Sequence, residues 1–84
     1  MHVYLTTNLD RYKLSHFPDN LEIPPRIGER VYIKQEYQKH YRDQQLPTEL
    51  EVTMVNWTSH GIMVELWYTQ TAFKSAKLNN INLF

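Results

Sequence analysis

The chain has 84 residues, 42% of them hydrophobic and 13% aromatic, so it is long enough to bury one core and too apolar to be disordered. Nine basic residues balance nine acidic residues, which excludes a global electrostatic attraction to nucleic acid or to an anionic membrane and leaves room only for a local patch. The absence of cysteine excludes disulfides, thiolate zinc sites and cysteine nucleophiles.

No apolar run approaches the roughly 20 residues that a membrane-spanning helix needs. The first residues, MHVYLTTNLDRYK, lack the charged start and apolar stretch of a secretory signal. We therefore expect a soluble, cytoplasmic protein that forms one small domain over residues 1–84.

The first third of the chain predicts one strand and a long connection. Residues 1–7, MHVYLTT, are rich in β-branched and aromatic side chains, which favours a strand. Residues 8–28 have few periodic apolar positions and many turn-forming residues, which favours a connection without regular structure. We expect four apolar side chains to anchor this connection to the core: Leu14, Phe17, Leu21 and Ile23.

A second strand is predicted at residues 29–34, ERVYIK, directly after a turn at Gly28. The polarity of this stretch alternates, so Val31 and Ile33 would face the core. The opposite side would carry Arg30, Tyr32 and Lys34.

Residues 35–45, QEYQKHYRDQQ, are polar apart from two tyrosines four positions apart, Tyr37 and Tyr41. That spacing places both rings on one side of a short helix, which Pro47 would end. An extended loop would also present both rings, so the sequence leaves these two alternatives open.

The clearest signal is ELEVTMVNWTSHGIMVELWYT, residues 49–69, which predicts two strands and a turn. The turn is centred on residues 58–60, and Gly61 is available for a positive φ angle. A register that pairs Met54 with Val64 gives one continuous apolar face for the core. The members of this predicted core face are Leu50, Val52, Met54, Val64 and Leu66.

In the same register, the opposite face of the hairpin is half apolar and half acidic. Its predicted pairs are Val55 with Met63, Thr53 with Glu65, and Glu51 with Trp67. Contiguous exposed apolar residues usually mark an interface. Two interpretations therefore stay open: the C-terminal helix covers this face as a second core layer, or the face is a docking surface.

The C-terminal segment predicts a short helix with Thr69 or Thr71 as its N-cap. An apolar stripe at helical spacing would be formed by Ala72, Phe73, Ala76 and Leu78. Asn79 and Asn80 would end the helix. We expect residues 81–84, INLF, to add a short strand or to dock against the core.

Together these elements predict a mostly β, α+β domain with one or two short helices, arranged as a small antiparallel sheet or a partly open barrel. Residues 24–68, in which PPRIGERVYI leads to ELEVTMVNWTSHGIMVEL, resemble small SH3-like barrels, where a glycine-containing turn precedes a barrel strand and a strong hairpin follows. This resemblance implies a scaffold that binds peptides, proteins or nucleic acids.

Motifs that carry catalysis are missing from the sequence: there is no HExxH pair, no phosphate-binding glycine loop and no nucleophile elbow. The histidines show no spacing that would present metal ligands together. We therefore expect no enzyme, no cofactor and no metal. A compact hydrolase that uses paired histidines, among them His16 and His60, is the third hypothesis.

A basic and aromatic stretch supports the second hypothesis, a small barrel that binds nucleic acid. Its residues are Arg30, Tyr32, Lys34, Tyr37, Lys39, His40, Tyr41 and Arg42. Three acidic residues in the same stretch, Glu29, Glu36 and Asp43, would repel phosphate.

The leading hypothesis is a non-enzymatic protein-binding module with an accessory or regulatory role, whose partner is another protein or a second copy of the chain. Tryptophan and methionine are enriched in interface cores. The candidate binding residues are Val55, Trp57, Met63 and Trp67.

Overall fold

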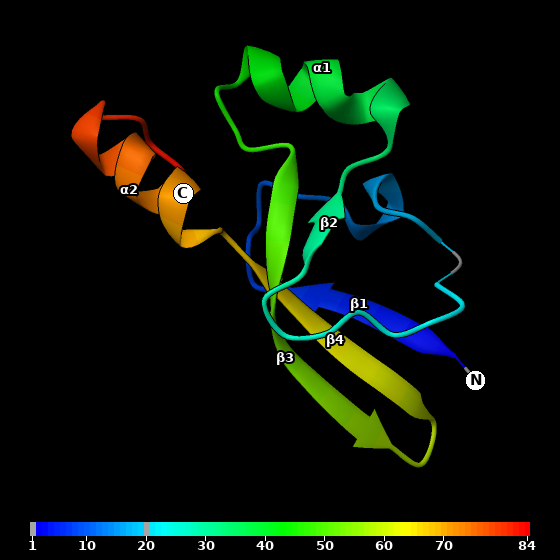
Figure 1. Cartoon of the computed structure of the whole chain (residues 1–84). Coiled ribbons are helices and arrows are strands. Elements are labelled where there is room, and N and C mark those ends of the chain that lie inside the picture. Colours follow the sequence, from blue (N-terminus) through cyan, green and yellow to red (C-terminus); the bar gives the residue numbers. More distant parts are fainter. Residues whose placement is uncertain (1, 20) are drawn as a thin grey trace.

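The structure is a computed structural model that describes residues 2–19 and 21–84. Within these residues, four strands form one curled half-barrel sheet, accompanied by two α-helices and one 3₁₀ helix (Figure 1). In chain order the elements are β1 (Val3–Thr7), η1 (Leu14–His16), β2 (Arg30–Tyr32), α1 (Gln35–Asp43), β3 (Glu49–Thr58), β4 (Gly61–Trp67) and α2 (Gln70–Leu78). The mostly β fold class with two short helices is confirmed. None of the helices within the described residues is long and apolar enough to cross a membrane.

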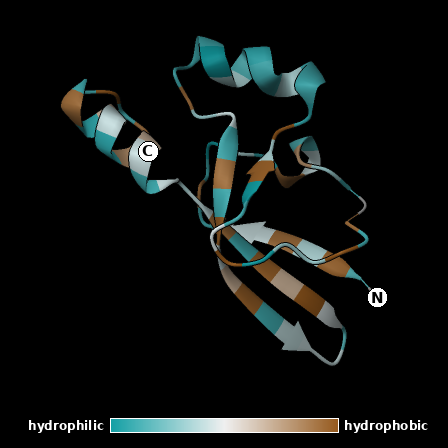
Figure 2. Cartoon of the chain, viewed as in Figure 1, coloured by the Kyte–Doolittle hydropathy of each residue, from teal (hydrophilic) through white to brown (hydrophobic). Residues whose placement is uncertain are grey.

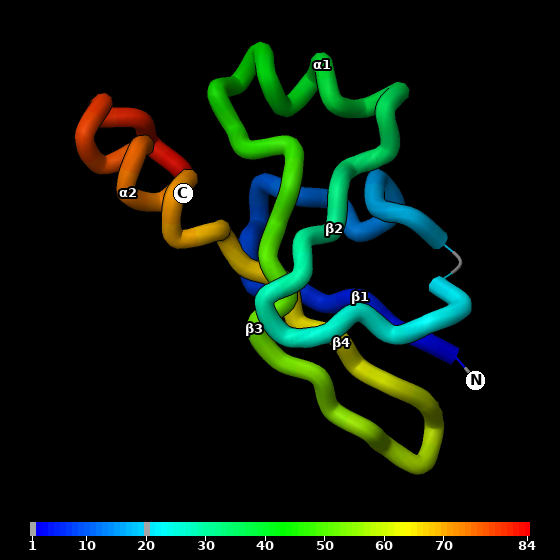
Figure 3. The backbone as a smooth tube through the Cα atoms, in the orientation of Figure 1, coloured from blue at the N-terminus to red at the C-terminus, as the bar shows by residue number. Residues whose placement is uncertain are grey.

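The strand order in the sheet is β1-β4-β3-β2. The pairs β2–β3 and β3–β4 are antiparallel, whereas β1 runs parallel to β4 and departs from a purely antiparallel arrangement. No hairpin links β1 to β4, so chain connectivity does not force these two strands to be antiparallel. The β3–β4 hairpin extends away from both helices (Figures 1 and 3).

A β-bulge in β3 changes the predicted register of the hairpin. Val52 pairs with Leu66 as expected, but the register shifts between Val52 and Met54. The predicted pairing of Met54 with Val64 is therefore wrong, and Val64 pairs with Val55. One extra residue reverses which side chains face the core, because side chains alternate along a strand. Met54 is consequently 44% exposed.

The same bulge also changes the residue pairs on the opposite face of the hairpin. The predicted pairs Val55–Met63 and Thr53–Glu65 are wrong, whereas the pair Glu51–Trp67 is confirmed. The observed partners are Asn56 for Met63 and Met54 for Glu65. Val55 lies on the core side of the sheet, where it is half-buried against the core.

The core lies on the concave side of the sheet and receives side chains from every part of the chain. Figure 2 shows the apolar residues as bands that alternate with polar ones along the strands. The buried apolar residues are Leu9, Tyr12, Phe17, Val31, Ile33, Tyr41, Leu46, Leu50, Val52, Ile62, Val64, Leu66, Tyr68, Ala76 and Leu83. Complete burial of one aliphatic side chain contributes about 1.5–3 kcal/mol. The predicted inward positions of β2 and of the hairpin, apart from Met54, are confirmed.

The connection before β2 is held by different residues from those expected. Of the predicted anchors Leu14, Phe17, Leu21 and Ile23, only Phe17 is fully buried; Leu21 is half-buried, and Leu14 and Ile23 are exposed. Leu9 and Tyr12 take their place, and the Tyr12 hydroxyl donates a hydrogen bond to the Pro47 carbonyl over 2.7 Å. The turn at η1 directs Phe17 inward and leaves Leu14 outside.

The polar stretch, for which the sequence left open a helix or a loop, forms the helix α1. This helix packs on the core through Tyr41. At its C-terminus, Gln45 adopts a positive φ of 59° and the Leu46 amide donates to the Tyr41 carbonyl over 2.9 Å. Pro47 then begins the extended approach to β3. The predicted helix is thus confirmed, with its end two residues earlier than expected.

The helix α2 has its N-cap at Thr69, one of the two caps that the sequence left open. The Thr69 hydroxyl accepts a hydrogen bond from the Ala72 amide over 3.1 Å, and Ala76 is buried. Leu78 does not join the apolar stripe, because it is 84% exposed. The helix ends at Asn79 and Asn80 as predicted.

Residues 81–84 dock against the core and form no strand. Leu83 is buried, and the Tyr68 hydroxyl donates a hydrogen bond to the Leu83 carbonyl. This contact fixes the end of the described chain beside the C-terminal end of β4.

Candidate functional site

The side of the sheet turned away from the core is called here the outer face. Residues that pair across neighbouring strands share one side of a sheet, so the strand register defines its members. At the hairpin and β1, these are Tyr4, Thr6, Glu51, Met54, Asn56, Met63, Glu65 and Trp67. The outer face continues onto β2 through Arg30 and Tyr32.

Three large apolar side chains lie close together on the outer face. Tyr4 pairs directly with Met63, and Met54 pairs with Glu65, two residues along β4 from Met63. Tyr4 is 43% exposed, Met63 42% and Met54 44%. An apolar cluster of this kind on an ordered sheet is typical of a contact surface.

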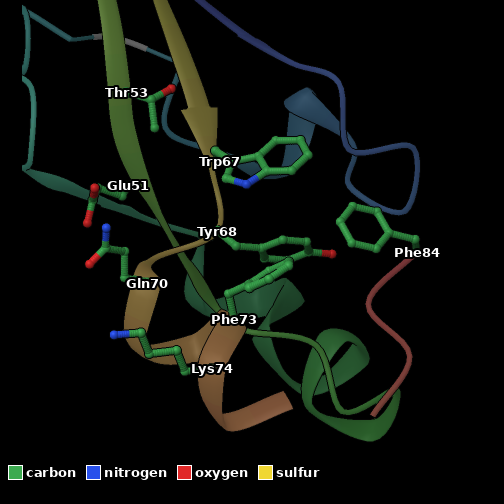
Figure 4. Close-up of a pocket in the computed structure, with 8 residues that line it drawn as sticks. All are labelled: Glu51, Thr53, Trp67, Tyr68, Gln70, Phe73, Lys74 and Phe84. Carbon is green, nitrogen blue, oxygen red and sulfur yellow. The ribbon is translucent and has the colours of Figure 1, made fainter. Parts of the chain in front are cut away.

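A groove adjoins the outer face where β4 ends at Trp67. It encloses about 500 Å³. Its lining residues, all drawn in Figure 4, are Glu51, Thr53, Trp67, Tyr68, Gln70, Phe73, Lys74 and Phe84. The Phe84 ring lies 5.8 Å from the Trp67 ring and 5.6 Å from the Tyr68 ring, between centroids. The groove therefore has aromatic walls and a polar rim that includes Glu51 and Lys74.

The C-terminal segment covers one end of the outer face and leaves the other open. Trp67 is half-buried beside Phe84, which in turn contacts Phe73 of α2 at 6.4 Å between ring centroids. Met63 and Tyr4 lie farther along the hairpin and stay exposed. The two interpretations left open by the sequence each describe one part of this face: a covered layer at Trp67 and an open surface at Met63.

The four residues predicted to bind a protein do not form one face. Met63 and Trp67 lie on the outer face. Val55 and Trp57 pair with Val64 and Ile62 and so lie on the core side of the sheet. Trp57 stands near the hairpin tip and is 66% exposed. Sequence reasoning missed Tyr4 and Met54, because the pairing of β1 and the bulge carried no local signal.

The aromatic residues of the basic stretch are used largely in packing. Tyr41 is buried, stacks on Tyr12 at 5.0 Å between ring centroids, and its hydroxyl lies 2.8 Å from Nδ1 of His16. Tyr37 stacks on His16 at 4.0 Å. Tyr32 alone among the three predicted tyrosines presents an exposed ring. The structure therefore does not bring these rings together as a platform for bases.

Three of the basic side chains in that stretch lie in ion pairs. These are Arg30 with Glu49 at 3.4 Å, Lys34 with Asp19 at 2.8 Å and Lys39 with Asp43 at 3.2 Å. The Glu49 carboxylate beside Tyr32 raises the pKa of that phenol. Arg42 is exposed on α1. Carboxylates thus accompany the cations of this stretch, which reduces the net positive field that phosphate would meet.

The histidines are placed in packing and surface positions. Contact with its neighbours desolvates His16, and this lowers the pKa of its imidazole, as do the nearby charges of Lys13, His40 and Lys34. His60 lies in the β3–β4 turn. Across residues 2–19 and 21–84, no three histidine, aspartate or glutamate side chains gather closely enough to hold a metal ion.

Comparison with family models, with curated proteins and with solved structures finds no match for this chain. The curled half-barrel sheet is a property of the structure itself. The SH3-like resemblance of residues 24–68 stays a prediction.

Proposed function

We propose that this chain is a non-enzymatic module that docks on a protein partner through the outer face, as an accessory or regulatory factor. The carrying observation is the cluster of Tyr4, Met54 and Met63, each about two-fifths exposed on one ordered side of the sheet. The cysteine-free composition suits a reducing compartment such as the cytoplasm.

The composition of the outer face favours a protein over other ligands. Tyrosine, tryptophan and methionine are enriched in interface cores, and buried pockets hold the side chains that dominate binding energy. The groove beside Trp67 supplies such a pocket at one end of the face. Glu51 and Glu65 lie among the apolar residues, so the complementary surface would be apolar with basic residues at its rim.

The face is also well suited to rigid docking. Strand pairing holds Tyr4 against Met63 and Met54 against Glu65, so their relative positions are set by the backbone. Side chains that are already ordered lose less conformational entropy when a partner binds. Replacing Met63 should therefore affect binding more than folding, since its side chain is exposed.

The test is affinity capture from nuclease-treated native lysate, with Met63→Glu compared with the wild type. We expect a protein bound in stoichiometric amount by the wild type and lost with Met63→Glu, because a carboxylate at the centre of the contact would be buried without a partner. Leu78→Glu is the matched control, since Leu78 is exposed on α2 away from this face. It should retain the partner.

Equal capture by the wild type and by Met63→Glu would contradict docking through this face. Loss of folding in Met63→Glu, measured by circular dichroism, would show instead that Met63 is needed for the fold. Recovery of nucleic acid from untreated lysate, with a steep salt dependence, would favour the stretch from Arg30 to Arg42.

A further inference from the structure

The strand β2 pairs with only the first part of β3, so residues 53–58 of β3 form an open edge of the sheet. Some backbone groups on this edge point away from the neighbouring strand β4. The Ile62 amide donates to the His2 carbonyl on the β1 side over 2.9 Å, so it does not bond to Trp57, its partner across the hairpin. In an antiparallel ladder, bonded and non-bonded pairs alternate. Trp57 and, two residues earlier, Val55 therefore direct their N–H and C=O groups outward.

The residues just before β2 form hydrogen bonds with this edge of β3 only as far as Val52. The Val52 amide donates to the Glu29 carbonyl over 2.8 Å, and the Val52 carbonyl accepts from the Gly28 amide over 2.9 Å. Beyond the bulge, no residue in 2–19 or 21–84 hydrogen-bonds to the outward groups of Val55 and Trp57. Two donors and two acceptors thus lie in line on an open edge.

Apart from the bulge before Met54, the open edge lacks the usual protection against pairing with another strand. Natural edges carry charged residues or proline that prevent association. Residues 53–58, TMVNWT, contain neither, and the turn residues Ser59 and His60 add no fixed charge. An uncharged stretch of six residues whose outward backbone groups are unpaired is able to accept a further strand.

We propose that the occupant of this edge is a second copy of the chain, joined through antiparallel pairing of the two β3 strands. A two-fold axis at Asn56 places Val55 of each copy opposite Trp57 of the other. Both residues direct N–H and C=O toward the partner, so two reciprocal pairs of backbone hydrogen bonds form.

The edge is complementary to itself in this register, which is why a second copy is favoured over an unrelated strand. An apolar side chain meets an apolar one at Val55 and Trp57, and an amide meets an amide at Asn56. No like charges face each other between residues 53 and 58. An interface related by a two-fold axis requires such self-complementarity.

The dimer would join the two four-stranded sheets into one continuous sheet. Because paired residues share one side of a sheet, both outer faces would lie on the same side. This inference does not rest on the proposed docking function, since the edge pairs through backbone groups of Val55 and Trp57, whose side chains lie on the core side of the sheet. If the dimer and the docking proposal both hold, the dimer would present two outer faces and could bind a partner bivalently.

Sedimentation velocity over a concentration series tests the proposal, with the wild type, Asn56→Lys and Asn56→Glu. Asn56 is exposed, so these variants should fold. We expect the wild type to dimerise and each variant to raise the dimer dissociation constant by roughly fivefold or more, because like charges face each other at the axis. Mixing the two variants should restore dimerisation, since lysine then faces glutamate.

A wild type that stays monomeric up to about 1 mM, the weak end of specific association, would overturn the proposal. So would dimerisation that neither Asn56 variant changes, because the contact would then lie elsewhere, such as the outer edge of β1. Tyr4→Glu changes the outer face on β1, two strands away from this edge, and should leave the dissociation constant of the dimer unchanged. That result separates failure of the dimer from failure of the docking proposal.

Discussion

Gly61 allows β1 to approach the β3–β4 hairpin closely. A Cβ atom at this position would lie 2.5 Å from the His2 carbonyl oxygen and 2.9 Å from the Tyr4 ring. Its φ angle of +144° also disfavours other residues. The exposed position of Tyr4 on the outer face therefore depends on the missing side chain of a residue on the neighbouring strand.

Gly61→Ala should lower the free energy of unfolding by more than about 2 kcal/mol, because the backbone of β1 must move to relieve the clash. Gly28→Ala is the matched comparison: Gly28 also has a positive φ, but a Cβ atom there would meet no other atom within 4 Å. Urea denaturation of both variants measures the difference. Equal losses would show that φ strain alone, and not the approach of β1, determines the cost.

Tyr12 makes stability depend on pH in alkaline solution. Burial raises the pKa of its phenol in the folded state, as do the neighbouring Tyr68 and Tyr41. Below about pH 10 both folded and unfolded chains keep the proton, and stability is complete. Above it only the unfolded chain loses the proton, so the free energy of unfolding should fall as pH rises.

Tyr12→Phe should reduce this alkaline loss, and at neutral pH it should cost about 1 kcal/mol because the Pro47 carbonyl loses its donor. Urea denaturation at neutral pH and above about pH 10 measures both effects. Tyr4→Phe, which removes the hydroxyl of an exposed tyrosine, is the control. An unchanged slope in Tyr12→Phe would mean that other groups cause the loss.

At the scale of elements, the C-terminal segment determines how much of the outer face is open. The α2 helix starts immediately after Thr69, and residues 81–84 return to place Phe84 beside Trp67. The N-cap at Thr69 sets the direction in which the helix leaves the sheet. The groove therefore depends on this cap as well as on its aromatic walls.

Thr69→Ala should lower the free energy of unfolding by about 1 kcal/mol, because the Ala72 amide loses its acceptor. Thr69→Ser keeps the hydroxyl and should retain most of the stability. Thermal and urea denaturation of the two variants distinguish the cap from simple loss of volume at this buried position. Equal destabilisation by serine and alanine would contradict the capping role.

Element types were predictable from the sequence, whereas their registration was not. The alternation of apolar residues in β2 and the capping threonine of α2 are local signals, and both predictions are confirmed. The bulge before Met54 has no such signal, since neither glycine nor proline marks it. A single-residue shift therefore moved Val55 to the core side and Met54 to the outer face.

The candidate site was only partly predictable for the same reason. Met63 and Trp67 follow from the unbroken alternation of β4. Tyr4 joins them through a parallel pairing between distant segments, which no local pattern encodes. The burial of Tyr41 likewise depends on Tyr12 and His16, which lie in a stretch without regular periodicity.

At the scale of the whole molecule, one side of a small sheet is covered and the other is largely open. The long connection, α1 and the C-terminal segment all contribute to the core on the concave side. A short chain has little material left to cover a second side. The outer face is therefore available for a partner, and the hairpin carries it away from the helices (Figure 1).

The most direct test of the docking account is methyl NMR of the methionine side chains while the captured partner is added. If the partner docks on the outer face, the methyl signals of Met54 and Met63 should shift or broaden, because both side chains lie there. The alanine methyl of Ala72, on α2, serves as the reference and should stay unchanged. Methionine signals that stay unchanged while the partner binds would contradict docking through the outer face.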